Sequence, residues 1–341
     1  MGRPMARLRV YRQMWGVLEC KGGPFASADA AFARIKALGY DGVETGLASV
    51  EWAGGAAAWR QLLDKHDLRF AGQAFSFGPN HEGLGLGAQP SDEPAEHLAT
   101  LLAHVQALDA IGCDFVNAQS GPDWWAEEQA VEYFEAAAEW SAPRADYSPV
   151  HHETHRSKYL HTPWVTRRLV ERVPQLTLTA DLSHFLVTSE ADWPPALRQV
   201  SAAVAEIAAG GRCRHIHGRV GHTQGPQVSD PRAPEAQAML EQHLSWWGDI
   251  WEAQHKAGVR VMSITPEHGP PPYQPSLPFS QIPTADIWSI NHMVGLSAKR
   301  EFARRMEALG EAAECELRDV DPGYVEEGAT GDGGQFEGSA V

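Results

Sequence analysis

The chain has 341 residues, of which 43% are apolar, and its formal net charge is −16. This length suits two average domains or one large α/β barrel with additions, since such barrels run to about 250 residues and can exceed 400. The acidic balance disfavours nucleic acid or an anionic membrane as a partner, because either would require a basic face.

The cysteines and the N-terminus bear on the compartment. The four cysteines lie far apart and form no CxxC pair, which disfavours a disulfide framework and fits a reducing compartment. The basic residues near Met1 precede no apolar run, so we expect no signal peptide. No stretch approaches the roughly 20 apolar residues of a membrane-spanning helix. We therefore expect a cytoplasmic protein with no membrane partner.

Short apolar, β-prone runs alternate with amphipathic helical segments along the chain. The expected strands are residues 9–17, 42–47, 68–77, 114–119, 147–153, 176–181, 213–220 and 259–265. The expected helices are residues 27–38, 55–66, 93–111, 126–140, 163–172, 194–209, 235–257 and 285–309.

Eight alternations of strand and helix imply parallel strands joined by right-handed crossovers. They predict a single (β/α)₈ TIM barrel over residues 1–310, although the fifth strand is the least regular. Residues 311–341 carry nine acidic side chains, one basic side chain and many glycines. We expect this segment to be a disordered acidic tail.

Side chains that can bind a metal ion close the last four expected strands. Glu153, Asp181, His217 and Glu267 each stand where a strand gives way to a loop. A single carboxylate there is more often a helix cap or a solvated residue. The carboxyl ends of consecutive barrel strands converge on one mouth, however, so the four side chains should meet. Together they predict a site for one divalent metal ion, with Mn²⁺, Mg²⁺ or Co²⁺ favoured and Zn²⁺ possible.

Other residues close to the expected strand ends are candidates for substrate binding: His184, Arg219, His155, Arg156 and Trp15. His184 can approach the metal shell from its loop, as a substrate ligand or an acid–base group. Arg219 suits a substrate oxygen or carboxylate. The cations beside Glu153 could contact a polyhydroxylated ligand, or could form a solvated loop. Trp15 could stack on a sugar face, and core packing explains it equally well.

Several residues have alternative interpretations. His215 shares a strand face with the candidate metal ligand and favours a supporting or packing role, and Glu44 is a weaker site candidate. Trp246, Trp247 and Trp251 recur at helical spacing, so they should pack on the barrel or on a partner subunit. The second alternative would make the protein a homo-oligomer.

At these residues the chain resembles the xylose isomerase-like TIM barrel superfamily of sugar (phosphate) isomerases and epimerases. The matching segments are 39–44, the strand end at Glu153, 181–184, 215–219 and 266–267. Members similar to ketose 3-epimerases bind one divalent ion through Glu, Asp, His and Glu. The resemblance implies that these ligands are Glu153, Asp181, His217 and Glu267, and that His184 and Arg219 contact substrate.

The chemistry that such a shell supports is proton transfer next to a carbonyl through a metal-bound enediolate. Glu153 and Glu267 would lie on opposite sides of the substrate carbon and act as the catalytic acid and base. The substrate would be a small carbohydrate. Loss of a β-hydroxyl would instead make the protein a dehydratase of a keto-sugar or keto-inositol. An endonuclease on the same barrel is disfavoured by the net charge, and a non-catalytic sugar-binding barrel by the intact shell.

Overall fold

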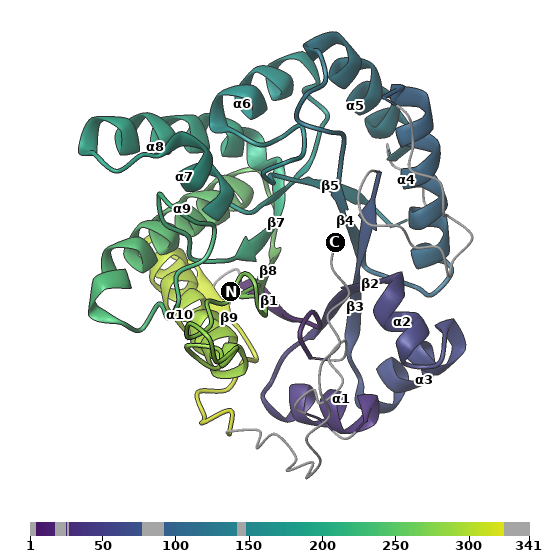
Figure 1. The fold of residues 1–341 in the computed structure, drawn as a ribbon, viewed down its shortest axis with the longest axis vertical. Coiled ribbons are helices and arrows are strands. Elements are labelled where there is room, and N and C mark those ends of the chain that lie inside the picture. Colours follow the sequence, from purple (N-terminus) through teal and green to yellow (C-terminus); the bar gives the residue numbers. More distant parts are fainter. Residues whose placement is uncertain (1–4, 18–24, 26, 77–91, 142–147, 324–341) are drawn as a thin grey trace.

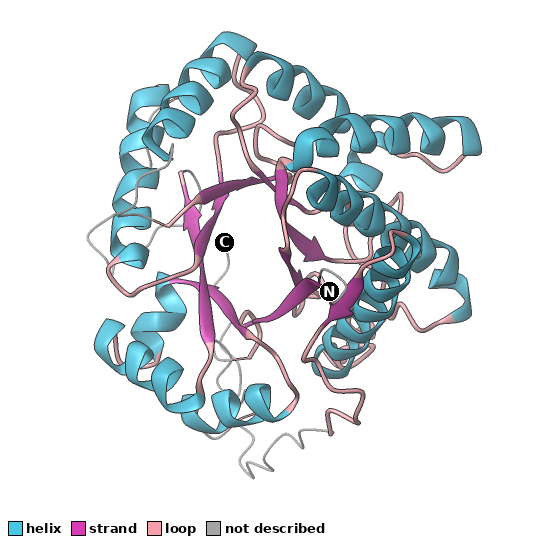
Figure 2. Ribbon diagram, turned by 180° about the vertical axis from the view of Figure 1, so that it is seen from behind, coloured by secondary structure: helices cyan, strands magenta, loops and turns pink. Residues whose placement is uncertain are grey.

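The computed structural model describes residues 5–17, 25, 27–76, 92–141 and 148–323. Its strands are β1 (Met5–Gln13), β2 (Gly42–Gly46), β3 (Arg69–Phe75), β4 (Phe115–Gln119), β5 (Val150–Glu153), β6 (Leu178–Ala180), β7 (Cys213–Gly218), β8 (Val261–Pro266) and β9 (Ala312–Glu314). From β1 to β8, each strand pairs in parallel with the next, and β8 pairs with β1. The sheet is therefore a closed barrel, seen end-on in Figures 1 and 2, and the predicted TIM barrel is confirmed.

Helices surround the ring of strands (Figure 2). They are α1 (Ala28–Ala37), α2 (Leu47–Trp52), α3 (Ala56–His66), α4 (Pro94–Asp109), α5 (Glu127–Ser141), α6 (Pro163–Arg172), α7 (Ser183–Ser189), α8 (Pro194–Ala208), α9 (Gln237–Lys256) and α10 (Ile287–Ala308). Local signals set several boundaries. The Ser27 side chain caps α1 by accepting a hydrogen bond from the Ala30 amide at 3.2 Å. Thr162 caps α6 in the same way, and Pro163 occupies the first helical position.

The sequence analysis missed two short helices, α2 and α7. Helix α2 follows β2 directly, and two residues separate α7 from the end of β6. Each spans no more than two turns, which is too short for a helical period to show in the sequence. The first strand also begins earlier than expected, at Met5. Its first residues pair with β8 and β9, partners more than 240 residues away in the chain that no local pattern reveals.

Part of the segment expected to be a tail packs on the barrel. Strand β9 pairs in parallel with Met5–Arg7 of β1. The Arg318 amide then donates to the Leu38 carbonyl at 2.9 Å, and Lys299 Nζ donates to the Leu317 carbonyl at 2.6 Å. Residues 324–341, the rest of the expected disordered tail, lie outside the described residues.

The tryptophans of α9 belong to the core of the protein. Trp246, Trp247 and Trp251 are at most 1% exposed, and the Trp251 ring meets the edge of Phe302 at 5.4 Å. Because these rings are buried within one chain, they cannot form a subunit interface, and the alternative that they contact a partner is wrong. Among the described helices, none is long and apolar enough to cross a membrane.

Candidate metal centre at the mouth of the barrel

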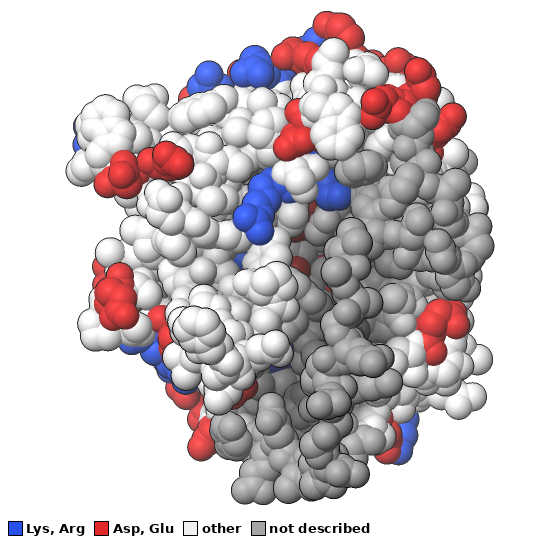
Figure 3. Space-filling view, in the orientation of Figure 1, with Lys and Arg blue, Asp and Glu red and all other residues white. Residues whose placement is uncertain are grey.

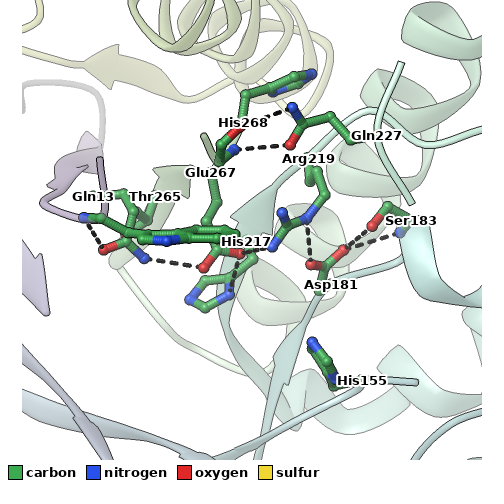
Figure 4. A network of polar contacts seen from close by, with 12 residues as sticks. Gln13, His155, Asp181, Ser183, His217, Arg219, Gln227, Thr265, Glu267 and His268 are labelled. Carbon is green, nitrogen blue, oxygen red and sulfur yellow. Dashed lines mark hydrogen bonds and ion pairs between the residues drawn. The ribbon is translucent and has the colours of Figure 1, made fainter. Parts of the chain in front are cut away.

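The structure brings the four expected metal ligands together. Glu153 ends β5, Asp181 follows β6, His217 lies in β7 and Glu267 follows β8. All four are buried, with Glu267 the most exposed at 4%. One ligand atom from each lies within 4.8 Å of the corresponding atoms of the other three. Figure 4 shows Asp181, His217 and Glu267 of this set pointing toward one another.

Two ligand atoms in this cluster are buried without a hydrogen-bond partner among the described residues, as expected if they bind a cation. His217 Nδ1 lies 2.8 Å from Glu267 Oε2 and 3.4 Å from Glu153 Oε1, yet its geometry forms no hydrogen bond among the described residues. Glu153 Oε1 is likewise buried without a hydrogen-bond partner there, whereas its Oε2 accepts from Asn117 Nδ2 at 2.7 Å. Buried polar atoms are normally paired, so this arrangement fits a divalent ion between three carboxylates and one imidazole.

Glu44 orients the His217 ring from the other side of the barrel. Its Oε1 lies 2.8 Å from His217 Nε2, and its Oε2 lies 3.1 Å from His215 Nε2. Burial raises the pKa of Glu44, but the two imidazoles outweigh burial and hold that pKa well below its usual range. If His217 Nε2 donates to an ionised Glu44, its Nδ1 would be the nitrogen that faces a metal ion. The sequence analysis ranked Glu44 as a weak candidate and did not foresee this contact.

Replacing Glu44 by Gln should weaken metal binding about 10- to 100-fold, because the amide supports the His217 tautomer less well. Competition with a chromogenic chelator measures the affinity. Asp41→Asn is the matched control, since Asp41 precedes the same strand but bonds to Arg7 and the Val10 amide. Unchanged affinity in Glu44→Gln would contradict the orienting role.

Arg219 lies between Asp181 and Glu267. Its Nε donates to Asp181 Oδ2 at 3.1 Å and its Nη2 donates to Glu267 Oε2 at 2.6 Å (Figure 4). Gln13 Nε2 donates to the other oxygen of Glu267 at 3.0 Å. Burial raises the pKa of Glu267, but the opposing effect of His217 and Arg219 is larger and brings that pKa down to about 2. Arg219 Nη1 is buried without a partner among the described residues, so one edge of this guanidinium can contact a ligand.

Two imidazoles adjoin the shell on the side of Asp181. His184 Nε2 lies 3.4 Å from Asp181 Oδ2, and the ring centroids of His184 and His155 are 4.0 Å apart. Burial lowers the pKa of His155 to about 3 and that of His184 well below its usual range, so both rings are neutral at pH 7. Neither nitrogen of His184 forms a hydrogen bond within the described part of the chain. His184 can therefore donate to or accept from a substrate hydroxyl.

An aromatic and cationic wall borders the site. The Tyr273 ring lies 4.7 Å from the Arg219 guanidinium, 5.2 Å from that of Arg156, and 5.2 Å from the Trp15 ring. Gly269 makes room for Trp15, since an added Cβ would lie 2.1 Å from that ring. The sequence analysis missed Tyr273, which lies directly after three consecutive prolines, Pro270 to Pro272. In Figure 3, basic side chains stand beside a central hollow, and acidic atoms are visible inside it.

Lys158, which the sequence analysis also passed over, lies in the loop after β5 and is 5% exposed. Burial lowers its pKa to about 8, against the opposing effect of Glu153 and Asp123.

The fold and this cluster define a TIM-barrel protein with a set of metal-ligand side chains at the carboxyl ends of its strands. A model of the xylose isomerase-like TIM barrel family matches residues 32–230, more than half of the chain. The chain therefore belongs to the xylose isomerase-like TIM barrel family.

Solved structures share this fold at low sequence identity. A D-allulose 3-epimerase from Methylomonas sp. is 17% identical, with a TM-score of 0.52 over 89% of this chain and 100% of that one. A xylose isomerase domain-containing protein from Salmonella typhimurium LT2 is 14% identical, with a TM-score of 0.53 over 86% and 97% of the two chains. An IolI protein with a bound zinc atom is 13% identical, with a TM-score of 0.52 over 88% and 98%. No curated protein matches the chain.

Proposed function

We propose that this protein is a divalent-metal-dependent enzyme that isomerises or epimerises a sugar or polyol by proton transfer next to a carbonyl. The observation that carries the proposal is the buried cluster of Glu153, Asp181, His217 and Glu267, whose ligand atoms lie within 4.8 Å of one another. A divalent ion held by this cluster would supply Lewis-acid stabilisation of the negative charge that develops on substrate oxygen. Mn²⁺, Mg²⁺ or Co²⁺ suits the three carboxylates, and the imidazole also allows Zn²⁺.

The protein's own side chains would move the proton. Glu153 and Glu267 come from β5 and β8, so they approach the centre of the mouth from different strands. One carboxylate removes the proton beside the carbonyl, and the second, or the first again, returns it. Asn117 holds Glu153 through Oε2, and Gln13 with Arg219 holds Glu267. These contacts fix both carboxylates before substrate arrives, which lowers the cost of reaching the reactive geometry.

The same mouth offers groups for a polyhydroxylated substrate. We assign substrate binding to His184, Arg219, His155, Arg156 and Trp15, and add Tyr273 to them. Both nitrogens of His184, and Nη1 of Arg219, are buried without a hydrogen-bond partner among the described residues, so they have hydrogen-bonding capacity for a substrate. The aromatic wall can pack on the apolar face of a sugar. The likeness to a D-allulose 3-epimerase and to a zinc-bound IolI protein is in keeping with this assignment.

We also propose a cytoplasmic location. Cys113, Cys213 and Cys315, the cysteines within the described ranges, form no disulfide, as a reducing compartment would require.

Solvent deuterium uptake tests the proposed function. The metal-reconstituted protein is incubated in D₂O with a panel of ketoses and keto-inositols, and exchange is followed by NMR. We expect deuterium at a carbon next to the carbonyl, and loss of exchange in Glu267→Gln. The product separates the reactions: an aldose shows isomerisation, a second ketose shows epimerisation, and an unsaturated product shows the alternative dehydration. Absence of exchange across the whole panel would contradict the proposal.

A further inference from the structure

A second cavity lies at the opposite end of the barrel from the candidate metal centre. Its volume is about 600 Å³. Several lining residues are the first of their strands: Arg69 of β3, Phe115 of β4, Val150 of β5 and Val261 of β8. The cavity therefore opens at the amino ends of the strands, whereas the metal ligands stand at or near the carboxyl ends.

The described lining of this cavity contains three arginines and one carboxylate, so the charge of these residues is unbalanced. Asp114 is the single acidic residue among the described lining residues. Arg69 already binds it through two contacts of 2.5 Å, and the Tyr11 hydroxyl donates to it at 2.7 Å. The positive charges of Arg9 and Arg214 are left without a carboxylate in the lining. Arg9 Nε is in addition buried without a hydrogen-bond partner among the described residues.

A break in strand register explains how Arg214 reaches the cavity. Leu178 of β6 pairs with Cys213, but the next residue, Thr179, pairs with His215, so Arg214 is an extra residue in β7. Strict alternation would place Arg214 on the face opposite to His215, which lies inside the barrel. A bulge can re-aim the extra side chain, and Arg214 lines the cavity together with Arg9.

The floor of the cavity is aromatic and carries no charge. The Tyr11 and Phe115 rings meet edge to face at 5.6 Å, and the His151 ring lies 5.6 Å from Phe115. Burial lowers the pKa of His151 to about 3, so this ring is neutral at pH 7. Thr177 and Ser263 also line the volume. Within the described lining, the cavity thus combines two cations that have no carboxylate partner with a neutral, partly apolar floor.

We propose that this cavity is a binding site for a small phosphorylated ligand, with its phosphate group held between Arg9 and Arg214. The strands that carry these residues, β1 and β7, flank β8 on either side. Their backbones are therefore about 10 Å apart, from two spacings of roughly 4.8 Å, and two arginine side chains can converge on one group across that gap. A phosphate dianion matches the two charges and accepts paired N–H donors from a guanidinium. The remaining volume takes the organic part over the aromatic floor.

Calorimetric titration with inorganic phosphate, and separately with glucose 6-phosphate, tests this site. The unmodified protein should bind each at a single site, and the Arg9→Gln/Arg214→Gln double variant should bind about 100-fold more weakly, at roughly tenfold per charged contact. The control is Arg300→Gln/Arg304→Gln, which removes two exposed arginines of α10 and should bind normally. Succinate, a dicarboxylate of equal charge, should bind more weakly than phosphate.

Three outcomes would overturn the proposal: no phosphate binding up to millimolar concentration, equal binding by the Arg9/Arg214 double variant, or tighter binding of succinate. Thermal unfolding without phosphate checks that both double variants are folded. Phosphate binding that disappears in Arg156→Gln but survives in the Arg9/Arg214 variant would place the anion at the mouth and also overturn the proposal. The site is independent of the proposed function, so Glu267→Gln should bind phosphate like the unmodified protein.

Discussion

Changing Glu153 and Glu267 together to Gln should remove both the bound metal ion and catalytic turnover. The two carboxylates supply half of the candidate ligand shell and both of the proposed proton-transfer groups. Loss of one positioned acid or base alone typically costs about 10²- to 10⁴-fold in rate. Elemental analysis should find about one divalent ion per chain in the unmodified protein and none in the double variant. Deuterium uptake should be undetectable in the same sample.

The matched control is Glu127→Gln/Glu128→Gln, which removes two carboxylates of α5 that pair with Arg172 at the surface. It should retain the ion and the turnover. If the unmodified protein holds no ion even after soaking with Mn²⁺ and Zn²⁺, the isomerase proposal fails. A non-catalytic sugar-binding barrel would then describe the protein better.

Replacing Arg219 by Met should lower the free energy of unfolding of the metal-free protein by about 3–5 kcal/mol. Arg219 is 2% exposed, and its guanidinium separates two buried carboxylates, Asp181 and Glu267. Without it, these carboxylates are left buried and poorly compensated. A divalent ion at the same carboxylates offsets part of that cost. Urea unfolding with and without the ion should therefore show a smaller loss when the metal is present.

Arg305→Met is the control for this prediction. Arg305 also contacts several carboxylates, those of Asp249, Glu252 and Glu301, but its network lies at the surface. Its loss should cost less, because partly exposed ion pairs contribute about 0–1 kcal/mol each, and the cost should not depend on metal. An Arg219→Met penalty that is equal with and without the ion would show that Arg219 does not share its carboxylates with a metal.

The barrel could be predicted because its signals are local. Apolar β-prone runs and amphipathic helices alternate, and alternation of this kind permits few topologies. Most strand limits fell within a few residues of the expected ones. The cluster of candidate metal ligands followed from the same logic: Glu153, Asp181, His217 and Glu267 lie at or near the ends of consecutive strands, and parallel strands of a barrel end at one mouth.

The sequence by itself therefore determined the repeating unit, the closed barrel and the candidate ligands at its mouth. Only the tertiary structure decided which distant residues support them. Glu44 meets His217 across 173 residues, Tyr273 reaches Arg219 from a loop without periodicity, and β9 pairs with β1 from the far end of the chain. The extra residue Arg214, which lines the second cavity, depends on the register between β6 and β7. Periodicity reports which face of an element is buried, whereas these contacts depend on how the strands align when the barrel closes.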